Sequence, residues 1–412
     1  MQLYMIKDKI IFFDAPQYKT DRDLVTIEHQ IESDSFYMVG FSGLYANTIK
    51  GSLPGYEIEV WRIDDRVDQL KTRNVNGIRG KIYPMKIFLS RDFAYNFRLI
   101  KDLKKEAKEN NLVFIFSGIH SFFFLILSVF FRTTPIVGIQ LGGANSYFKY
   151  KINKSVISLI YSVIESKIYL KKLAHARLYT NAERIYLGKV LENKQISDFP
   201  VLPIDFDLMH PINKKIAREY LKLPENEKII YQTGRAFRNK GTDVTISVWL
   251  KYLKDKGIKL ILTGIHESDE LFDLVKNSGV DYIGVVPRAD LPYWYSAADI
   301  YIYPPFDEET LNFGGVGYAP LEALACGTPL ICTTMINFPD FEKNKNRIRG
   351  ICIIPKNEED VVNGVLGFLH SPPSKEKCRA LVTDYFTKEK IAKNFTNTII
   401  DIQQTRTWFK TC

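Results

Sequence analysis

Residues Phe313–Cys332 read FGGVGYAPLEALACGTPLIC, and the run Asp299–Tyr303 (DIYIY) precedes them. The β-branched and aromatic residues of that run predict a buried strand. The closely spaced glycines that follow allow a loop whose backbone amides can approach a ligand; they are Gly314, Gly315 and Gly317. We expect Pro320 to open a helix that Gly327 ends. The stretch therefore predicts a strand, a glycine loop and a helix N-terminus, an arrangement that binds phosphate in doubly wound α/β folds.

Glu322 lies in the first turn of this predicted helix. A carboxylate there would repel a bound phosphate, so we expect it to contact something neutral, such as sugar hydroxyls. The alternative is an ordinary turn between a strand and a helix, with Glu322 on the surface.

The stretch from Gly315 onward resembles the signature of the retaining glycosyltransferases of family 4, E-G-F-G-L-x-P-L-E-A-x-A-C-G-T-P. The resemblance implies the GT-B architecture, an α/β fold of two facing Rossmann-like domains with parallel doubly wound sheets and a C-terminal crossover helix. It also implies that Glu322, the second Glu of the family's motif, binds the ribose of a nucleotide sugar. The neighbouring residues implied to contact this donor are Gly314, Gly315, Val316, Gly317, Tyr318, Pro320 and Leu321.

Gly314 stands where the family carries its first Glu, which lies near the donor sugar. Glu308 and Glu309 lie close upstream and are candidates for a substitute carboxylate on the sugar side. The expected contact to the sugar therefore departs from the family's pattern, whereas the contact to ribose follows it.

Two cations follow another predicted strand, Lys228–Thr233 (KIIYQT). Arg235 comes directly after Gly234, and Lys240 comes just before a predicted helix. The resemblance implies that Gly234 contacts the donor and that Arg235 and Lys240 act in catalysis by clamping its diphosphate, with Arg238 as a possible third cation. Negative charge grows on the departing diphosphate as the sugar–oxygen bond breaks, and fixed cations stabilise that state. The alternative is ordinary surface charge.

Strands and helices alternate between these two motifs, which argues for a parallel doubly wound sheet with its ligand at the carboxyl ends of the strands. No strand is followed by GxGxxG with an acid about 20 residues further on, so a dinucleotide dehydrogenase is disfavoured. Val286 is implied to edge the base pocket. The expected elements are strands Lys259–Thr263, Asp281–Val286, Ile300–Tyr303 and Leu330–Cys332 and helices Val244–Tyr252, Leu291–Ala298 and one from about Ser268.

The N-terminal half gives fewer signals. We expect its first strand over Tyr37–Tyr45 (YMVGFSGLY), which leaves residues 1–35 as an extra segment of unknown role, and its second over Tyr56–Ile63. Val201–Pro211 resembles the family's interdomain segment. The expected domains are residues 1–205 on the acceptor side, residues 206–387 for nucleotide-sugar binding, and a closing helix over 388–412 that returns to the first domain.

Three residues of this half are implied by the resemblance to lie near the substrates. Gly43, at the turn after the expected first strand, is implied to lie beside the donor diphosphate. His120 is implied to face the acceptor or donor sugar and to act in catalysis, although a lone His in an apolar run can equally be structural. Gln140 stands where the family often carries a second His, and its amide can hydrogen-bond a sugar hydroxyl.

Leu112–Phe131 contains no Asp, Glu, Lys or Arg and is long enough to span a bilayer. Because Gly118 and His120 interrupt it, we expect a buried strand over Leu112–Phe116, a turn, and a packed helix over Ser121–Phe131 instead. A transmembrane helix is the alternative.

The chain has 412 residues, a net charge of +9 and a pI near 9.0, so we expect a negatively charged partner. No zinc-binding, helix-turn-helix or RNP pattern points to nucleic acid. Much of the charge lies in Asn145–Thr180, where the only acid is Glu165. A basic amphipathic helix there can lie on an anionic membrane, although a core-facing helix with a solvated basic face fits equally. Its basic residues are Lys149, Lys151, Lys154, Lys167, Lys171, Lys172 and Arg177, and its apolar residues are Val156, Ile157, Leu159, Ile160, Val163, Ile164 and Ile168.

The five cysteines all lie in the C-terminal half and form no CxxC pair. We therefore expect neither disulfides nor a zinc site, which suits the reducing cytoplasm. Lys and Asp interrupt the opening MQLYMIKDKIIFF, so no signal peptide is expected. No Asp-rich pair indicates a metal, and no cofactor is expected.

These patterns together predict a retaining, metal-independent hexosyltransferase that uses a nucleoside diphosphate sugar and a glycan or lipid-linked acceptor, with peripheral membrane association. One alternative is a nucleotide-sugar epimerase of the same two-domain build. Another is a non-catalytic glycosyltransferase partner subunit, suggested by Gly314 and Gln140.

Overall fold

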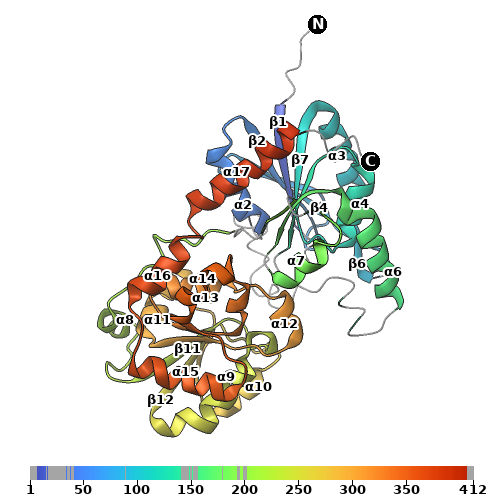
Figure 1. Ribbon diagram of the computed structural model, residues 1–412. Coiled ribbons are helices and arrows are strands. Elements are labelled where there is room, and N and C mark those ends of the chain that lie inside the picture. The colour runs from blue at the N-terminus through green and yellow to red at the C-terminus, as the bar shows by residue number, and fades with distance from the viewer. Residues whose placement is uncertain are drawn as a thin grey trace. The chain divides into compact units, whose positions relative to one another are not determined.

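The computed structural model describes residues 7–14, 16, 34, 38, 41–88, 90–140, 148, 151, 156–178, 180–192, 195–197 and 202–405. It divides the chain into two compact units (Figure 1). Unit 1 comprises Met1–Leu202 and Glu389–Cys412, and unit 2 comprises Pro203–Lys388.

Unit 1 is built on an eight-stranded sheet in the order β10-β9-β8-β7-β1-β2-β4-β3, parallel except for the β3–β4 pair. The chain runs outward from β1 in both directions, so β1 and β7 flank a topological switch point, the usual ligand position in such sheets. The strands are β1 (Lys7–Phe13), β2 (Tyr56–Asp64), β3 (Lys71–Val75), β4 (Ile78–Pro84), β7 (Asn110–Ser117), β8 (Ile136–Gln140), β9 (Leu173–Leu178) and β10 (Ile196–Ser197), beside a separate hairpin of β5 (Lys86–Phe88) and β6 (Ser90–Tyr95).

Helices pack against this sheet over an aromatic core in which Phe13 meets Trp61, Phe114 and Phe123. The helices are α2 (Phe41–Ile49), α3 (Phe97–Glu109), α4 (Phe122–Phe130), α6 (Val156–Ile164), α7 (Asn181–Leu187) and α17 (Lys388–Thr405). Helix α6 continues through a π-helical turn, η3 (Glu165–Tyr169), and a 3-10 turn, η4 (Leu170–Lys172).

Helix α17 ends the described chain and packs on unit 1. Arg177 donates to the Asn394 side chain at 2.8 Å, and its guanidinium lies 4.6 Å from the ring centroid of Phe395. Phe395 also meets Phe12 and Tyr45. The last helix is thus part of the N-terminal core.

The expected first strand over Tyr37–Tyr45 is wrong. Phe41–Ile49 is helix α2, and the first strand is β1, which pairs with both β2 and β7 at the centre of the sheet. Its Lys9 looks like a surface charge in the sequence. In the structure Lys9 is 2% exposed, with its Nζ 2.8 Å from carboxylate oxygens of Glu59 and Glu106. Residues 1–35 therefore contain a central strand rather than only an extra segment.

The uncharged stretch Leu112–Phe131 forms the strand β7 and the helix α4, joined by a short turn, as the sequence predicts. Ser121 caps α4 by accepting from the Phe124 N–H at 3.2 Å. The transmembrane alternative is wrong for this stretch, and no helix in the described part of the chain is long and apolar enough to cross a membrane.

Unit 2 carries a six-stranded parallel sheet in the order β13-β12-β11-β14-β15-β16, with the switch point between β11 and β14. Three predicted strands are confirmed residue for residue: β11 (Lys228–Thr233), β14 (Ile300–Tyr303) and β15 (Leu330–Cys332). The others are β12 (Ile258–Thr263), β13 (Asp281–Ile283) and β16 (Cys352–Ile353).

Helices cover both faces of this sheet (Figure 1). They are α8 (Lys214–Tyr220), α9 (Thr242–Val248), α10 (Phe272–Ser278), α11 (Leu291–Ala297), α12 (Glu308–Phe313), α13 (Tyr318–Ala325), α14 (Phe341–Arg349), α15 (Glu358–His370) and α16 (Lys375–Thr383), with short turns η6 (Arg238–Lys240), η7 (Trp249–Leu253), η8 (Lys254–Lys256), η9 (Arg288–Asp290) and η10 (Thr333–Asn337).

Candidate functional site

The residues that the sequence singles out in unit 2 gather at the switch point of its sheet. Gly234, Arg235 and Lys240 follow β11, and the glycine loop with Glu322 follows β14. The two segments touch: a Cβ built on Gly241, whose φ is +67°, would lie 2.5 Å from the Pro304 carbonyl carbon. The fold therefore brings the two sequence motifs to one edge of the sheet.

The glycine loop turns the chain from β14 into α13. Gly317 precedes the helix with φ +83°, a backbone conformation that suits glycine. Pro320 occupies the third helical position rather than the expected first, which is still within the turn whose N–H groups lack helical partners. Val316 and Leu321 are fully buried in the core, so their side chains do not face a ligand.

A short helix that the sequence analysis missed, α12, precedes Gly314. Asp307 caps it by accepting from the Thr310 N–H at 2.8 Å, and Asn337 holds its end by donating to the Gly314 carbonyl at 2.7 Å. A Cβ on Gly314 would lie 2.5 Å from the Thr310 carbonyl oxygen. A glutamate side chain at this position would therefore force the local backbone to move. Asp307 followed by two glutamates is a helix-start signal that could have revealed α12.

Glu322 is 3% exposed, so the surface alternative for it is wrong. The Tyr295 hydroxyl donates to its Oε2 at 3.1 Å, and the Arg288 Nη2 lies 2.9 Å from its Oε1. Burial raises the pKa of Glu322, and the positive charge of Arg288 opposes that rise. Neither Arg288 nor Tyr295 was identified from the sequence, because both lie outside the glycine-loop motif, in the preceding elements η9 and α11.

Arg235 is held in place by Asp269, another residue that the sequence analysis missed. Its Nε lies 3.1 Å from Asp269 Oδ1, and its guanidinium lies 4.3 Å from the Phe237 ring. Asp269 also accepts from the backbone N–H groups of Ala236 and His266. Burial alone would raise the pKa of Asp269, but these hydrogen bonds and Arg235 lower it below its usual value. Arg235 is therefore oriented before any ligand arrives.

Lys240 is partly buried, and its Nζ lies 3.4 Å from the Tyr303 hydroxyl. No carboxylate among the described residues pairs with it. Burial accordingly lowers the pKa of its ammonium. Gln232 fixes the loop by donating to the Lys240 carbonyl at 2.7 Å. A partly buried cation without a counter-charge is a candidate site for an anion.

The surroundings of the remaining predicted residues of unit 2 do not by themselves indicate a ligand. Arg238 is 66% exposed and pairs with Asp243 and Glu270, each at 3.2 Å. Gly234 has φ +122° and open space where a side chain would be. Val286 packs against the core, and Glu309 and Tyr318 lie in the first turns of α12 and α13.

His120 follows β7 in unit 1, and two carboxylates hold it. Its Nδ1 lies 2.7 Å from Glu165 Oε1, and its Nε2 lies 3.1 Å from Glu183 Oε1. Glu165 also accepts from the hydroxyls of Tyr169 and Tyr186. Burial opposes the charged imidazole, but the two carboxylates outweigh it and raise the pKa of His120 to about 10. Both ring nitrogens are occupied, which favours the structural alternative.

Gly43 and Gln140 also differ from the expected setting. Gly43 lies inside α2 rather than in a turn after a strand, and the buried carboxylate of Asp14 already accepts from the Ser42 N–H at 3.1 Å. Burial raises the pKa of Asp14. Gln140 ends β8 and is buried. Asp14, His120 and Gln140 thus share the carboxyl edge of three adjacent strands, β1, β7 and β8.

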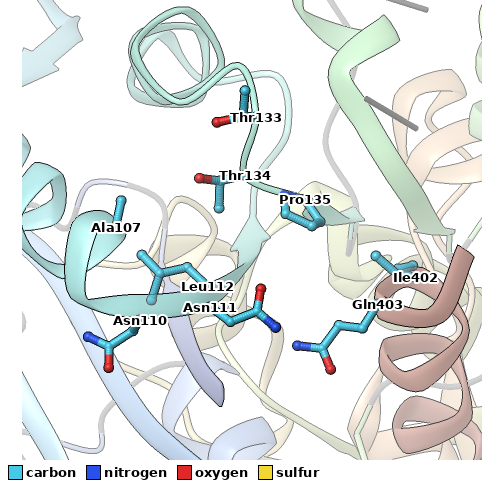
Figure 2. A pocket seen from close by; sticks show the side chains of 9 residues that line it. All are labelled: Ala107, Asn110, Asn111, Leu112, Thr133, Thr134, Pro135, Ile402 and Gln403. Atoms are coloured by element: carbon cyan, nitrogen blue, oxygen red, sulfur yellow. The ribbon is translucent and has the colours of Figure 1, made fainter. Parts of the chain in front are cut away.

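A hollow of about 290 Å³ lies at the opposite edge, at the amino ends of β7 and β8 (Figure 2). The amide side chains of Asn111 and Gln403 point toward each other across it. Its lining carries no charged side chain. This hollow is therefore separate from the candidate site. Within the described ranges, no group of three or more His, Cys, Asp or Glu side chains could hold a metal ion.

Part of the sequence is similar to known proteins. Residues 213–382 match the family described as glycosyl transferases group 1. The O-antigen chain mannosyltransferase B of Escherichia coli is 39% identical over 87 residues, which is 20% of this chain and 21% of that protein. An uncharacterized glycosyltransferase of Methanocaldococcus jannaschii is 30% identical over 169 residues, 40% of this chain and 41% of that protein. These matches thus cover less than half of either relative.

The fold of the whole chain also has solved counterparts. A sucrose-phosphate synthase from Thermosynechococcus elongatus superposes with a TM-score of 0.67 at 15% identity, over 96% of this chain and 99% of that one. The Anabaena protein HepE, solved in complex with UDP, superposes with a TM-score of 0.64 at 12% identity, over 95% and 100%. Residues 213–382 are therefore similar to the glycosyl transferases group 1 family, and the chain has the GT-B fold of the solved structures that it resembles.

Proposed function

We propose that the protein is a glycosyltransferase that moves a hexose from a nucleoside diphosphate sugar to a glycan or lipid-linked acceptor with retention of configuration. The observation that carries the proposal is the group of Lys240, Arg235 and Glu322 at the switch point of unit 2. A cation without a counter-charge, an oriented guanidinium and a buried carboxylate match the diphosphate and ribose of such a donor. The HepE structures with UDP and with UDP-glucose concern a protein of the same fold.

In the proposed reaction Lys240 and Arg235 bind the diphosphate and stabilise the charge that grows on it as the sugar leaves. Glu322 accepts hydrogen bonds from the ribose hydroxyls, and Val286 edges the base. A diphosphate oxygen takes the acceptor proton, so no protein nucleophile and no metal is required.

The sugar side of the site is less complete. Because Gly314 cannot carry a carboxylate, we propose that Glu309 or its neighbour Glu308, in the first turn of α12, binds the donor sugar hydroxyls. Gln140 is proposed to contact a sugar hydroxyl from unit 1. The similarity to an O-antigen chain mannosyltransferase and to a lipopolysaccharide core biosynthesis mannosyltransferase supports a glycan or lipid-linked acceptor.

We also propose that the protein works on the cytoplasmic side of an anionic membrane, to which helix α6 binds peripherally. Val156, Ile160 and Val163 are more than half exposed on this helix, so it does not turn all its apolar residues to the core. Arg177, expected on the basic face, is instead buried in unit 1, whereas Lys149 and Lys154 lie outside the described residues. The proposal therefore rests on Lys151, Lys167, Lys171 and Lys172.

The test is hydrolysis and transfer by the purified chain, followed by NMR of the anomer that is first released. Retention supports the proposal. Isomerised donor without acceptor would indicate the epimerase. The absence of donor turnover with every nucleotide sugar would indicate a non-catalytic partner subunit. Gly314, in place of a glutamate, is the observation that motivates this alternative.

A further inference from the structure

A second hollow in unit 1, of about 640 Å³, lies where the C-terminal end of α4, the turns η3 and η4 and the segment after α7 meet. Its charged lining is strongly one-sided, with a single acid, Glu192. The basic residues are Arg132, Lys167, Lys171 and Lys172. Such a concentration of cations around one concavity favours an anion.

Three of the four cations that line this basic hollow keep their charge exposed. Arg132, Lys167 and Lys171 are exposed, and no carboxylate among the described residues pairs with any of the three. An arginine fork and two ammonium groups can together satisfy several oxygens of one phosphate group.

A row of exposed apolar side chains adjoins the hollow. Val156, Ile160, Val163 and Ile168 are 66%, 56%, 52% and 50% exposed, and Ile168 also lines the hollow. The first three recur at helical spacing along α6. The other side of the same helix packs firmly, since Tyr169 and Leu170 are fully buried and Tyr161 and Ile164 lie against the core. The exposed row is therefore a second face of a well-packed helix.

We propose that the basic hollow binds the phosphate-bearing headgroup of an anionic phospholipid, while the exposed row of α6 enters the boundary of the acyl chains. This inference rests on the proposed membrane association and assigns it a site. Apolar burial and electrostatic attraction are the two terms that hold an interfacial helix on a membrane. A headgroup ligand explains why both lie next to each other, because a lipid phosphate is found directly above its acyl chains.

The test uses the full-length chain and sedimentation with vesicles of phosphatidylcholine, with and without phosphatidylglycerol. We expect binding only to the anionic vesicles. K167A/K171A should weaken it roughly 30-fold, because each basic residue near an anionic surface contributes about fivefold. I160S/V163S should weaken it as well. The matched control K101A/K105A removes the same charge from exposed positions on α3 and should bind nearly as the wild type does.

Equal loss in K167A/K171A and K101A/K105A would overturn the headgroup site but leave membrane association standing. Wild-type binding displaced by millimolar inorganic phosphate and insensitive to I160S/V163S would indicate a free phosphate site instead. No wild-type binding at low salt would overturn membrane association itself. Nucleotide binding and thermal melting, measured on the same preparations, show separately whether the donor site and the fold are intact.

Discussion

The charged side chains at the two switch points of this chain differ in whether the protein itself provides them with partners. In unit 1, the charge of His120 is met by Glu165 and Glu183, and Asp14 accepts from a helix N-terminus. In unit 2, Lys240 has no acidic partner among the residues that the structure describes, and Glu322 pairs with the exposed Arg288. Removing one partner of a satisfied buried pair lowers stability strongly, whereas a buried charge without a partner already costs stability and is a candidate for binding a ligand. The comparison supports the proposal that the donor binds to unit 2.

The largest expected effect concerns His120. His120→Ala leaves two buried carboxylates without their cation, so it should lower the free energy of unfolding by about 3–5 kcal/mol. Chemical denaturation measures this, with the exposed His210→Ala as the control. Normal stability combined with lost turnover would instead support the sugar-facing role of His120 and would contradict a purely structural role for the charges in unit 1.

The same contact predicts a pH dependence. Because the folded pKa of His120 is raised to about 10 from an unfolded value near 6.5, its stabilisation is complete below pH 6.5 and is lost as the pH rises toward 10. The wild type should therefore lose stability over this window more steeply than His120→Gln. Parallel curves for the two proteins would contradict a charged His120.

Lys240→Met should have the reverse pattern. It removes a cation that burial disfavours, so stability should stay equal or rise, while turnover should fall by about 10²–10³ because leaving-group stabilisation is lost. Arg235→Ala should lower turnover as well, but it should also reduce stability because it removes the partner of the buried Asp269. The control is Arg238→Ala, whose guanidinium pairs at the surface. A rise in the Michaelis constant alone, at unchanged turnover, would contradict the role in the transition state.

Glu322→Ala should weaken nucleoside diphosphate binding by about 1.5–3 kcal/mol, the usual contribution of a hydrogen bond to a charged group. Isothermal calorimetry measures it. Unchanged affinity would remove the ribose role from Glu322.

Arg288→Ala should have the smallest effect and should sharpen the account of Glu322. Without Arg288 the pKa of Glu322 rises further, so the carboxylate protonates and nucleotide affinity falls at a higher pH than in the wild type. Affinity measured from pH 8 to pH 5 should separate the two proteins at the acidic end only. Arg349→Ala, at an exposed position, is the control.

The strands of unit 2 could be predicted from the sequence because they are short apolar runs with clear turn signals on both sides. Three of them have the predicted first and last residues. The strands of unit 1 were harder to predict. Its central strand carries Lys9, and only the distant Glu59 and Glu106 explain why a lysine is buried there.

The residues of the candidate site also form two groups, those in local sequence motifs and those that only the fold brings to these motifs. Arg235, Lys240 and Glu322 belong to local motifs, so the resemblance of those motifs to a known family identified them. Asp269 and Arg288 support two of them from other segments, and only the fold reveals these contacts. His120 shows the converse, because its local sequence gives no sign of Glu165 and Glu183.

The central claim is that a nucleoside diphosphate binds at the switch point of unit 2, and thermal unfolding with a panel of nucleoside diphosphates tests it most directly. A ligand present at about 100 times its dissociation constant stabilises the folded chain by about 2.7 kcal/mol. We predict that one diphosphate raises the melting temperature of the wild type and of Arg238→Ala, and that the shift is much smaller in Lys240→Met and Glu322→Ala. No shift with any diphosphate, or an equal shift in all four proteins, would contradict the claim.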